Sequence, residues 1–313
     1  MANEKRLHDP YDVVIVGGGP AGLAAALTLA RARKRVLLCD SGPRRNAAAE
    51  HIHNFVTRDG TPPADFRQLA RRELSRYGVV DARDVRVDSI SGTRGAFRVQ
   101  LQTEVVEARR ALLCTGMIDE MLPIEGFREL WGRSIFQCPY CHGWEVQDRS
   151  WGYLARAFDP MSLSFALLLR GWTRDVVVFT NGTAYVPPDA QARLRSAGVR
   201  LELSPVSRLV ARERRLEAVE LSNGSRVPCD VLFAHPPQKQ VDLVGAMGLA
   251  LDEHGFVRVD EMTREASVRG VYASGDLTER MQSAVIAAAS GMRAAGMINH
   301  ELTIELAAVG GLG

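Results

Sequence analysis

The chain has 313 residues, of which 46% are hydrophobic and 24% charged, as in a globular protein of about two domains. Its formal net charge of +2, from 39 Lys and Arg against 37 Asp and Glu, gives no basis for a nucleic-acid partner. Because Met1–Pro10 is polar and no apolar run is long enough to span a bilayer, we expect a cytoplasmic protein without signal peptide or membrane segment.

The N-terminal segment carries the pattern of a dinucleotide-binding βαβ unit. Residues 11–16 predict a buried parallel strand, residues 21–32 a helix rich in Ala and Leu, and residues 35–39 a second apolar strand. A glycine-rich turn joins the first strand to the helix. Asp40 ends the second strand, where an acid typically bonds a ribose hydroxyl. The complete pattern indicates a dinucleotide site and not a mere tight turn.

Each residue of the glycine-rich turn has an expected role. Gly17 makes the turn, Gly19 lets the backbone approach a pyrophosphate, and Gly22 lets helix and strand pack closely. The helix N-terminus, at Pro20 and Ala21, adds a partial positive charge that favours phosphate. We therefore expect these five residues to bind the cofactor.

The polar stretch from Ser41 to Phe55 has turn signals and no clear period. It either lies against the cofactor or forms an exposed loop, and the sequence leaves both interpretations open. In the first case, the side chains available to bond the cofactor are those of Arg45, Asn46, His53 and Asn54.

One helix and several strands should complete this part of the chain. The pattern predicts a helix over 66–77, short strands within 79–103 with breaks at Ser91–Gly92 and Arg94–Gly95, and a buried strand over 111–116. Alternation in residues 97–101 predicts a half-buried antiparallel edge strand. Cys114 fits a core position.

Cys138 and Cys141 stand two residues apart in the stretch CPYCHG, whereas Cys39, Cys114 and Cys229 are scattered. A structural zinc site needs four ligands, and no second CxxC pair exists, so zinc is the weaker interpretation. A redox pair needs only two sulfurs in a tight turn, with one thiolate stabilised by positive charge or a helix N-terminus. Chance spacing within a turn is the remaining alternative.

His142 directly follows the second sulfur. The sequence leaves three roles open for this residue: it supplies positive charge to a thiolate, it moves a proton, or it is only a solvated turn residue. Five cysteines in a reducing compartment are not a disulfide framework, which makes the one close pair a catalytic candidate.

Residues 151–179 repeat the order of a nucleotide-binding unit without its residues. We expect a strand over 151–156, a helix over 162–170 and a strand over 175–179. The first turn carries Ala157, Phe158 and Asp159 where glycines are needed, and the carboxylate would repel phosphate. Neither a ribose-binding acid nor arginines for a 2′-phosphate follow the second strand. The pattern predicts a domain that kept its packing and lost its nucleotide.

The remaining chain offers fewer signals. Expected elements are a helix near 188–197, strands near 198–203 and 215–221, a hairpin turn at Asn223–Gly224, a hinge at His235–Pro237 and a frayed tail over 310–313. Residues 270–276 end in Asp276, before an Ala-rich helix from about Gln282 to Met297. An acid and a helix N-terminus so placed suit a cofactor's sugar-like chain and phosphate.

Over nearly the whole chain these motifs resemble the low-molecular-weight thioredoxin reductases. The resemblance rests on Gly17–Gly22, Asp40, Thr115–Gly116, Cys138–Gly143 and Gly270–Asp276, in that order. It implies an α/β fold with two Rossmann-like three-layer (ββα) domains. Residues 1–117 and 242–313 would form an FAD-binding domain, and residues 118–241 an inserted domain with the redox pair and a vestigial nucleotide site. A homodimer is implied as well.

The expected cofactor is FAD, and no metal site is expected. From the turn, the loop and the resemblance, the expected FAD-binding residues are Gly17, Gly19, Pro20, Ala21, Gly22, Asp40, Arg45, Asn54, Thr115, Gly116, Asp276 and Gln282. By the resemblance, Cys141 would face the flavin and Cys138 would exchange with the substrate.

Two departures from these reductases shift the expected function. His142 stands where they carry an Asp proton donor, and Cys-x-x-Cys-His-Gly is similar to dithiol oxidases of the gliotoxin and holomycin type. The NADPH-binding residues are missing. We therefore expect an FAD-dependent oxidase that converts a small-molecule or peptide dithiol to a disulfide with O2, with Cys138, Cys141 and His142 catalytic and His142 as the base.

Three alternatives stay open. One is a thioredoxin reductase-like enzyme that acts on a thioredoxin-like protein and takes electrons from a donor such as ferredoxin. The others are a non-catalytic flavin-binding sensor and an NADPH enzyme with an unusual binding turn.

Overall fold

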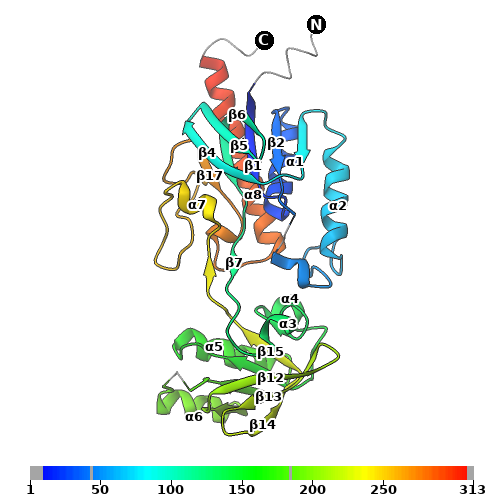
Figure 1. The fold of residues 1–313 in the computed structure, drawn as a ribbon, viewed down its shortest axis with the longest axis vertical. Helices are drawn as coiled ribbons and strands as arrows, with labels where there is room; N and C mark the ends of the chain where they lie inside the picture. The colour runs from blue at the N-terminus through cyan, green and yellow to red at the C-terminus, as the bar shows by residue number, and fades with distance from the viewer. Residues whose placement is uncertain (1–9, 43–44, 183–184, 309–313) are drawn as a thin grey trace. The chain divides into compact units, whose positions relative to one another are not determined.

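The computed structural model describes residues 10–42, 45–182 and 185–308. The chain forms two compact units (Figure 1). Unit 1 comprises the described residues of Met1–Ala47, Phe55–Ile118 and Gln238–Gly313, and unit 2 comprises Ala48–Asn54 and Asp119–Pro237. Unit 2 thus ends earlier than the predicted boundary at 241, and it takes in a short segment from the N-terminal part. The tail over 310–313, expected to fray, lies outside the described residues.

Unit 1 is built around a seven-stranded sheet. Its strands are β1 (Tyr11–Val16), β2 (Val36–Cys39), β3 (Val80–Arg83), β4 (Val87–Thr93), β5 (Ala96–Leu101), β6 (Glu104–Leu113) and β17 (Val271–Ala273). The order is β3-β2-β1-β6-β5-β4, with β17 also paired to β6. The end of β6 pairs in parallel with β1 and β17, whereas its first part pairs antiparallel with β5. One long strand therefore joins a parallel sheet to an antiparallel ribbon.

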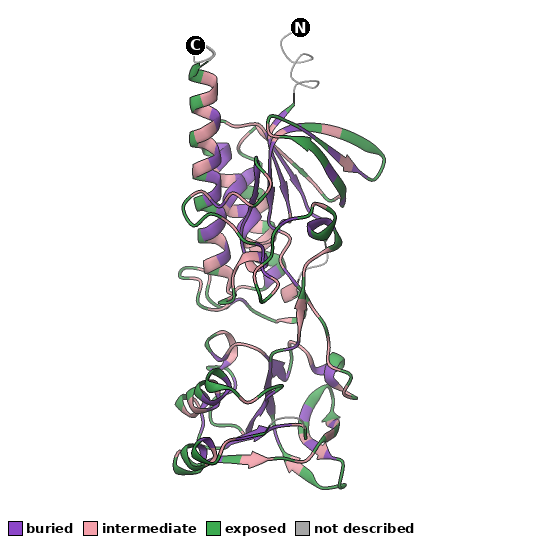
Figure 2. Ribbon diagram, turned by 90° about the vertical axis from the view of Figure 1, so that its left-hand side faces the viewer, coloured by how far each residue is buried: buried purple, intermediate pink, exposed green. Residues whose placement is uncertain are grey.

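The helices of unit 1 complete a three-layer arrangement. They are α1 (Pro20–Arg31), α2 (Pro63–Leu74), α7 (Asp242–Ala246) and α8 (Ala284–Ala308), with 3-10 turns at Arg45–Ala48 and Asp276–Thr278. Val13 and Ile15 of β1 pack with apolar residues of α1 and α8. Val14 packs on the other side with Phe97 and Val99 of β5. Because side chains alternate along a strand, the sheet is buried on both faces (Figure 2).

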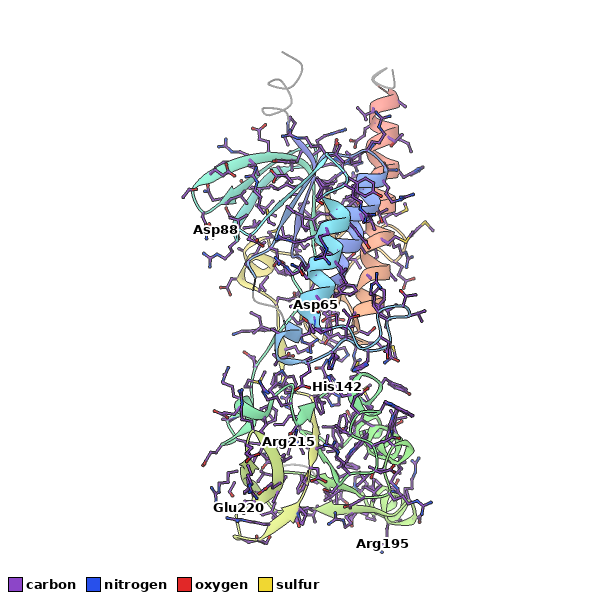
Figure 3. The ribbon with its side chains drawn as sticks, turned by 90° about the vertical axis from the view of Figure 1, so that its right-hand side faces the viewer. Asp65, Asp88, His142, Arg195, Arg215 and Glu220 are labelled. Atoms are coloured by element: carbon purple, nitrogen blue, oxygen red, sulfur yellow. The ribbon has the colours of Figure 1, made fainter. Side chains whose placement is uncertain are left out.

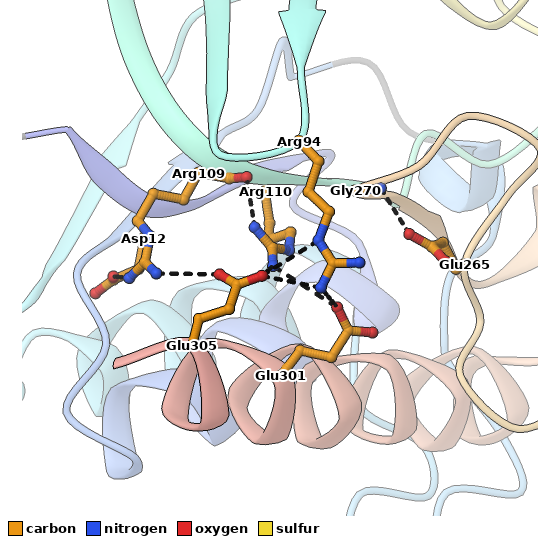
Figure 4. Close-up of polar contacts among 8 residues, drawn as sticks. All are labelled: Asp12, Arg94, Arg109, Arg110, Glu265, Gly270, Glu301 and Glu305. Carbon is orange, nitrogen blue, oxygen red and sulfur yellow. Dashed lines mark hydrogen bonds and ion pairs between the residues drawn. The ribbon is translucent and has the colours of Figure 1, made fainter. Parts of the chain in front are cut away.

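A charged cluster joins α8 to the sheet inside unit 1 (Figure 4). Arg110 of β6 is fully buried and donates to Glu305. Arg94 donates to Glu301 and to Glu305, at 2.9 Å each. A buried guanidinium without a partner is strongly destabilising, so the two acids fix the last turns of α8. This accounts for a helix that continues well beyond Met297, where the sequence analysis ends it.

Unit 2 has a five-stranded parallel sheet and a three-stranded antiparallel sheet. The parallel strands, in the order β11-β10-β9-β15-β8, are β8 (Ile135–Phe136), β9 (Trp151–Leu154), β10 (Val176–Phe179), β11 (Val199–Glu202) and β15 (Val231–Ala234). The antiparallel strands are β12 (Val206–Arg212), β13 (Arg215–Leu221) and β14 (Arg226–Pro228). The connections to unit 1 carry the short paired strands β7 (Ile118–Asp119) and β16 (Gln238–Lys239).

The parallel sheet of unit 2 is also covered on both faces. Its helices are α3 (Phe127–Leu130), α4 (Pro139–His142), α5 (Pro160–Leu168) and α6 (Pro188–Ser196), with a 3-10 turn at Leu169–Gly171. Val176 and Val178 pack with α5 and α6, while Val177 and Phe179 pack with β12 and β13. The predicted fold class, α/β with two Rossmann-like three-layer domains, is confirmed. No helix in the described ranges is long and apolar enough to cross a membrane.

Two predictions about the β4–β5 hairpin are wrong. β4 continues through Ser91–Gly92, because a Cβ on Gly92 would lie 2.4 Å from the Ala96 carbonyl oxygen, and only glycine allows that approach. The alternating burial of Phe97–Leu101 is confirmed, but β5 lies between β4 and β6 and is not an edge strand. The turn at Arg94–Gly95 is where the sequence predicts it.

In unit 2, the sequence does not predict strands β12 and β15, which the structure contains. β15 pairs with β9 inside the parallel sheet. The predicted hairpin turn at Asn223–Gly224 does connect β13 to β14.

Candidate active site

The glycine-rich turn connects β1 to α1 and is shaped by close backbone contacts. Gly17 has a φ of +113°, and a Cβ there would lie 2.2 Å from the Cys114 carbonyl oxygen. A Cβ on Gly22 would lie 1.9 Å from the Gly17 carbonyl oxygen, so neither position accepts a side chain. Around Gly19, by contrast, no atom lies within 4 Å of the Cβ position. The space over Gly19, beside Pro20 at the start of α1, therefore suits a ligand's phosphates.

Asp40 follows β2 and is 5% exposed. Its carboxylate accepts the Gly42 N–H at 3.0 Å and Nε of Arg67 at 2.7 Å. A Cβ on Gly18 would lie 2.3 Å from Oδ2 of Asp40, so the predicted ribose-binding acid lies against the glycine turn. Arg67, on α2, also bonds Asp84 at 2.7 Å. Arg67 carries no sequence signal, because an arginine on an amphipathic helix is an ordinary surface residue.

Arg45, Asp276 and Gln282 are far apart in sequence and meet within unit 1. Nη1 of Arg45 lies 3.1 Å from Oδ2 of Asp276 and also donates to the side-chain oxygen of Gln282. The amides of Gln282 and Gln238 exchange two hydrogen bonds, at 2.9 and 3.0 Å. Gln238 carries no sequence signal. The structure thus brings together three of the residues expected to bind FAD.

Thr115 and Gly116 follow the buried end of β6. Oγ1 of Thr115 is buried and has no hydrogen-bond partner among the described residues. Gly116 has a φ of +66° and open space at its Cβ position, and Ala21 in the first turn of α1 is buried. A buried hydroxyl without a partner is destabilising, and a bound ligand that satisfies it removes this cost. These features fit a dinucleotide cofactor such as FAD.

The redox pair stands where β8 leads into α4. The Sγ atoms of Cys138 and Cys141 lie 2.6 Å apart, within reach of a disulfide bond. Contact with the Cys141 thiol lowers the pKa of Cys138, as do the backbone N–H groups of Cys141 and Tyr140, against the effect of burial. A thiol with a lowered pKa supplies more thiolate near neutral pH and leaves faster from a disulfide.

The His142 side chain is half-buried, and both of its ring nitrogens are buried. The residue belongs to α4 in unit 2, where Figure 3 labels it. Its ring stacks on Phe136, with centroids 4.2 Å apart and planes inclined by 14°. Neither ring nitrogen reaches hydrogen-bond geometry with another described residue. Burial, reinforced by the charge of His53, lowers the pKa of His142 to about 4, and a weaker contact with the Cys138 backbone offsets this only in part. A lowered pKa does not favour a standing positive charge on His142, and buried ring nitrogens do not favour a solvated turn residue. Proton transfer stays a prediction.

The segment Ala48–Asn54 packs within unit 2 on the redox turn. The side-chain nitrogen of Asn54 donates to the Tyr140 carbonyl oxygen. Nε2 of His53 lies 3.5 Å from Oε1 of Glu145. Asn54, expected among the FAD-binding residues, thus bonds the redox turn within unit 2.

The other three cysteines are buried free thiols. Burial raises the pKa of Cys39 and of Cys229 to about 12, and it raises that of Cys114 as well. Such thiols stay protonated and unreactive near neutral pH. Within the described ranges, no group of three or more His, Cys, Asp or Glu side chains is placed to hold a metal ion. The Cys138–Cys141 pair thus stays the candidate for redox chemistry.

The family profile described as pyridine nucleotide-disulphide oxidoreductase matches residues 11–291 of the chain. The chain belongs to this family. Membership confirms the resemblance to thioredoxin reductases, FAD as the cofactor and an enzyme that acts on disulfides.

Three known proteins match this chain over most of their own length. Thioredoxin reductase tcpT from Claviceps purpurea (strain 20.1) is 33% identical over 308 residues, which cover 94% of this chain and 95% of that protein. The crystal structure of HlmI is 37% identical, with a TM-score of 0.88 over 96% of this chain and 95% of its own. An oxidoreductase from Agrobacterium tumefaciens is 34% identical, with a TM-score of 0.88 over 95% of this chain and 99% of its own.

In this pyridine nucleotide-disulphide oxidoreductase, the turn of unit 2 between β9 and α5 corresponds in position to a nucleotide-binding turn, and its residues hydrogen-bond to one another. Oδ1 of Asp159 caps α5 by accepting the Ser162 N–H at 2.7 Å, and Oγ of Ser162 donates to the Ala157 carbonyl oxygen at 2.9 Å. The Ser162 N–H lowers the pKa of the Asp159 carboxyl, which therefore stays ionised at the start of the helix. A helix N-terminus that holds its own carboxylate repels a phosphate. The glycine turn of unit 1 carries no such cap.

Proposed function

We propose that this enzyme is an FAD-dependent dithiol oxidase, which converts a small-molecule or peptide dithiol to a disulfide with O2 and without NADPH. The proposal rests mainly on the Asp159 carboxylate at the N-terminus of α5. This carboxylate lies in the turn where binding of a nicotinamide nucleotide would need glycines. When the cysteine pair is intact but the turn that would bind NADPH lacks its glycines, the simplest source of electrons is a dithiol substrate. The likeness of CPYCHG to gliotoxin- and holomycin-type dithiol oxidases supports the same direction.

The proposed thiol chemistry begins with a disulfide between Cys138 and Cys141. A substrate thiolate attacks Sγ of Cys138, the Cys138–Cys141 bond breaks, and Cys141 leaves as a thiolate. The second substrate thiol, after losing its proton, attacks the substrate sulfur of the mixed disulfide, and Cys138 leaves. The products are a substrate disulfide and a reduced pair. The lowered pKa of Cys138 favours its departure in the last step.

Unit 1 is proposed to hold FAD through the glycine turn, Asp40, Thr115 and the Arg45–Asp276–Gln282 cluster. When bound, FAD supplies a two-electron acceptor for the reduced Cys138–Cys141 pair, with O2 as the final acceptor. His142 is proposed to take the substrate thiol's proton, since its uncharged ring nitrogens are able to accept one.

We also propose that the enzyme acts as a homodimer in the cytoplasm. Helix α8 exposes the large apolar side chains of Val285, Met292 and Ile304, which are 41%, 61% and 55% exposed in the single chain. Exposed apolar groups of this kind are commonly buried where two copies of a chain meet. The cytoplasmic location is supported by three free thiols, a composition suited to a reducing compartment.

NADPH is expected not to bleach the flavin absorbance of the anaerobic enzyme. Ala157, Phe158 and Asp159 occupy the turn that would receive the pyrophosphate, and the ionised Asp159 repels it. The measurement is the visible spectrum after one equivalent of NADPH, with dithionite as the control that the bound flavin is reducible. Rapid stoichiometric bleaching would contradict the proposal and indicate an ordinary NADPH-dependent reductase.

His142→Phe is expected to slow dithiol-dependent oxygen uptake about 10²- to 10⁴-fold, the range for loss of a general base. Phenylalanine keeps the aromatic stack on Phe136 but has no nitrogen to accept a proton. His142→Ala, which loses both ring and nitrogens, is the matched comparison. If His142 only holds the loop, the Phe variant will be close to wild type and the Ala variant alone will be slow.

A further inference from the structure

Arg67, on α2, lies between two carboxylates that follow neighbouring strands of unit 1. Nε and Nη2 of Arg67 are each 2.7 Å from Oδ2 of Asp40, and Nη2 is also 2.7 Å from Oδ1 of Asp84. Asp40 comes directly after β2 and Asp84 directly after β3, and these two strands pair in parallel. One guanidinium therefore ties α2 to the carboxyl ends of both strands, the edge at which α/β sheets bind their ligands.

These contacts fix one oxygen of the Asp40 carboxylate and leave the other with an unused acceptor position. Oδ2 is held between Arg67 and the glycine turn, since a Cβ on Gly18 would lie 2.3 Å from it. Oδ1 accepts one N–H from the described residues, that of Gly42 at 3.0 Å. A carboxylate oxygen is able to accept two hydrogen bonds, so Oδ1 has room for one more donor. A ribose hydroxyl is a donor of this kind.

The charge of Asp40 depends on Arg67. The Asp40 side chain is only 6% exposed, and among the described residues its ion pair is the one with Arg67. A buried carboxylate that loses its cation is strongly disfavoured, and it either takes up a proton or turns toward solvent. In both cases the acceptor position of Oδ1 is lost or displaced. Arg67 therefore controls both the charge and the orientation of the acid.

An arginine beside a ribose-binding acid can instead hold a 2′-phosphate. Arg67 does not suit that role, because two carboxylates already share its guanidinium and both would repel a phosphate. Arg71 completes the cluster by bonding Asp84 at 2.8 and 2.9 Å. The four charges alternate and cancel, so no positive charge is left over for a phosphate. The cluster suits a ribose whose 2′-hydroxyl is free.

We propose that Arg67 is a positioning residue that holds the Asp40 carboxylate ready to accept the 2′-hydroxyl of the adenosine ribose of FAD. The inference rests on the proposed contact between Asp40 and FAD, and it names the side chain that makes this contact selective for the hydroxyl. Loss of Arg67 should weaken recognition of this one group and leave the contacts to the rest of the cofactor in place.

The test compares two ligands that differ by one hydroxyl: FAD, and FAD whose adenosine ribose lacks the 2′-hydroxyl. The full chain, freed of FAD, is titrated with each ligand, and quenching of the flavin fluorescence gives the two Kd values. For the wild type we expect the deoxy ligand to bind about ten-fold more weakly, because a hydrogen bond to a charged group is lost. For Arg67→Met the ratio of the two Kd values should fall to about one, since FAD itself then lacks that bond.

Arg71→Met is the matched control, because Arg71 lies on the next turn of α2 and bonds Asp84 but not Asp40. It should keep the wild-type ratio. The inference is overturned if Arg67→Met keeps that ratio or binds neither ligand, as damage to the fold would weaken both alike.

Asp40→Ala separates this inference from the contact on which it rests. If the ratio is lost in Asp40→Ala but kept in Arg67→Met, only the role of Arg67 is removed. If the wild type does not distinguish the two ligands, or if Asp40→Ala keeps the ratio, the proposed contact of Asp40 with FAD fails as well. None of these titrations needs a dithiol or O2, so they leave the proposed oxidase activity to its own tests.

Discussion

Cys138→Ser and Cys141→Ser are each expected to stop dithiol-dependent oxygen uptake, with a loss of at least about 10³-fold. Serine keeps the volume of the side chain but forms no disulfide, so neither variant passes two electrons from substrate to cofactor. The measurement is the oxygen-electrode trace with a panel of small dithiols, together with bleaching of the flavin by dithiol under anaerobic conditions and its recovery in air. Both variants should keep bound FAD, since the expected FAD-binding residues lie elsewhere.

Cys229→Ser is the matched control. Cys229 is also in unit 2, but it is fully buried, and its thiol donates to the Val231 carbonyl oxygen at 3.1 Å, a bond that a serine hydroxyl is able to make. We expect near wild-type turnover. If wild-type enzyme shows no dithiol-dependent uptake and a ferredoxin-like donor reduces the flavin, the electrons run the other way and the reductase alternative holds.

Gly19→Phe is expected to yield folded protein that retains almost no FAD. The Gly19 backbone is extended, with a φ of −78°, and its Cβ position is free of neighbours, so the protein tolerates a side chain there. The benzyl group would occupy the space over the helix N-terminus that the pyrophosphate needs. Flavin absorbance after reconstitution with excess FAD and gel filtration measures the loss, and circular dichroism checks the fold.

Gly245→Phe serves as the comparison for Gly19→Phe. Gly245 is exposed on α7 of unit 1 and likewise has no atom within 4 Å of its Cβ position. It should bind FAD as wild type does. Equal FAD retention in the two variants would show that the cofactor does not lie over the glycine turn.

The parts of the site that the sequence predicts are those that depend on local spacing. The strand, turn, helix and acid of residues 11–40 can be predicted because each step follows from backbone geometry within a few residues. The same is true of Cys138 and Cys141, whose separation by two residues is enough to bring the sulfurs together in a turn. The carboxylate of Asp159 in the second turn is predicted in the same way, whereas the cap that it forms on α5 is not.

The parts that the sequence does not predict depend on contacts between distant segments. Arg67 becomes significant only because α2 brings it to Asp40. The chemistry of His142 changes because Phe136 and the surrounding protein bury it, so that a residue expected to titrate near neutral pH has a pKa of about 4. Ala48–Asn54 lies within the stretch that the sequence leaves as either a cofactor-binding or an exposed loop, yet it packs with unit 2. No local pattern distinguishes these outcomes.

The charged cluster around Arg110 bears on the order in which the protein is completed during synthesis. Arg110 and its partner Glu305 are 195 residues apart in sequence. At about 5 to 20 residues per second, the ribosome needs about 10 to 40 s to add that length. During this interval the guanidinium is without its acids, and the sheet of unit 1 still lacks β17 and the cover of α8. The ribosome adds all of Asp119–Pro237 within the same interval. These residues of unit 2 can therefore fold before α8 is available to cover the sheet of unit 1.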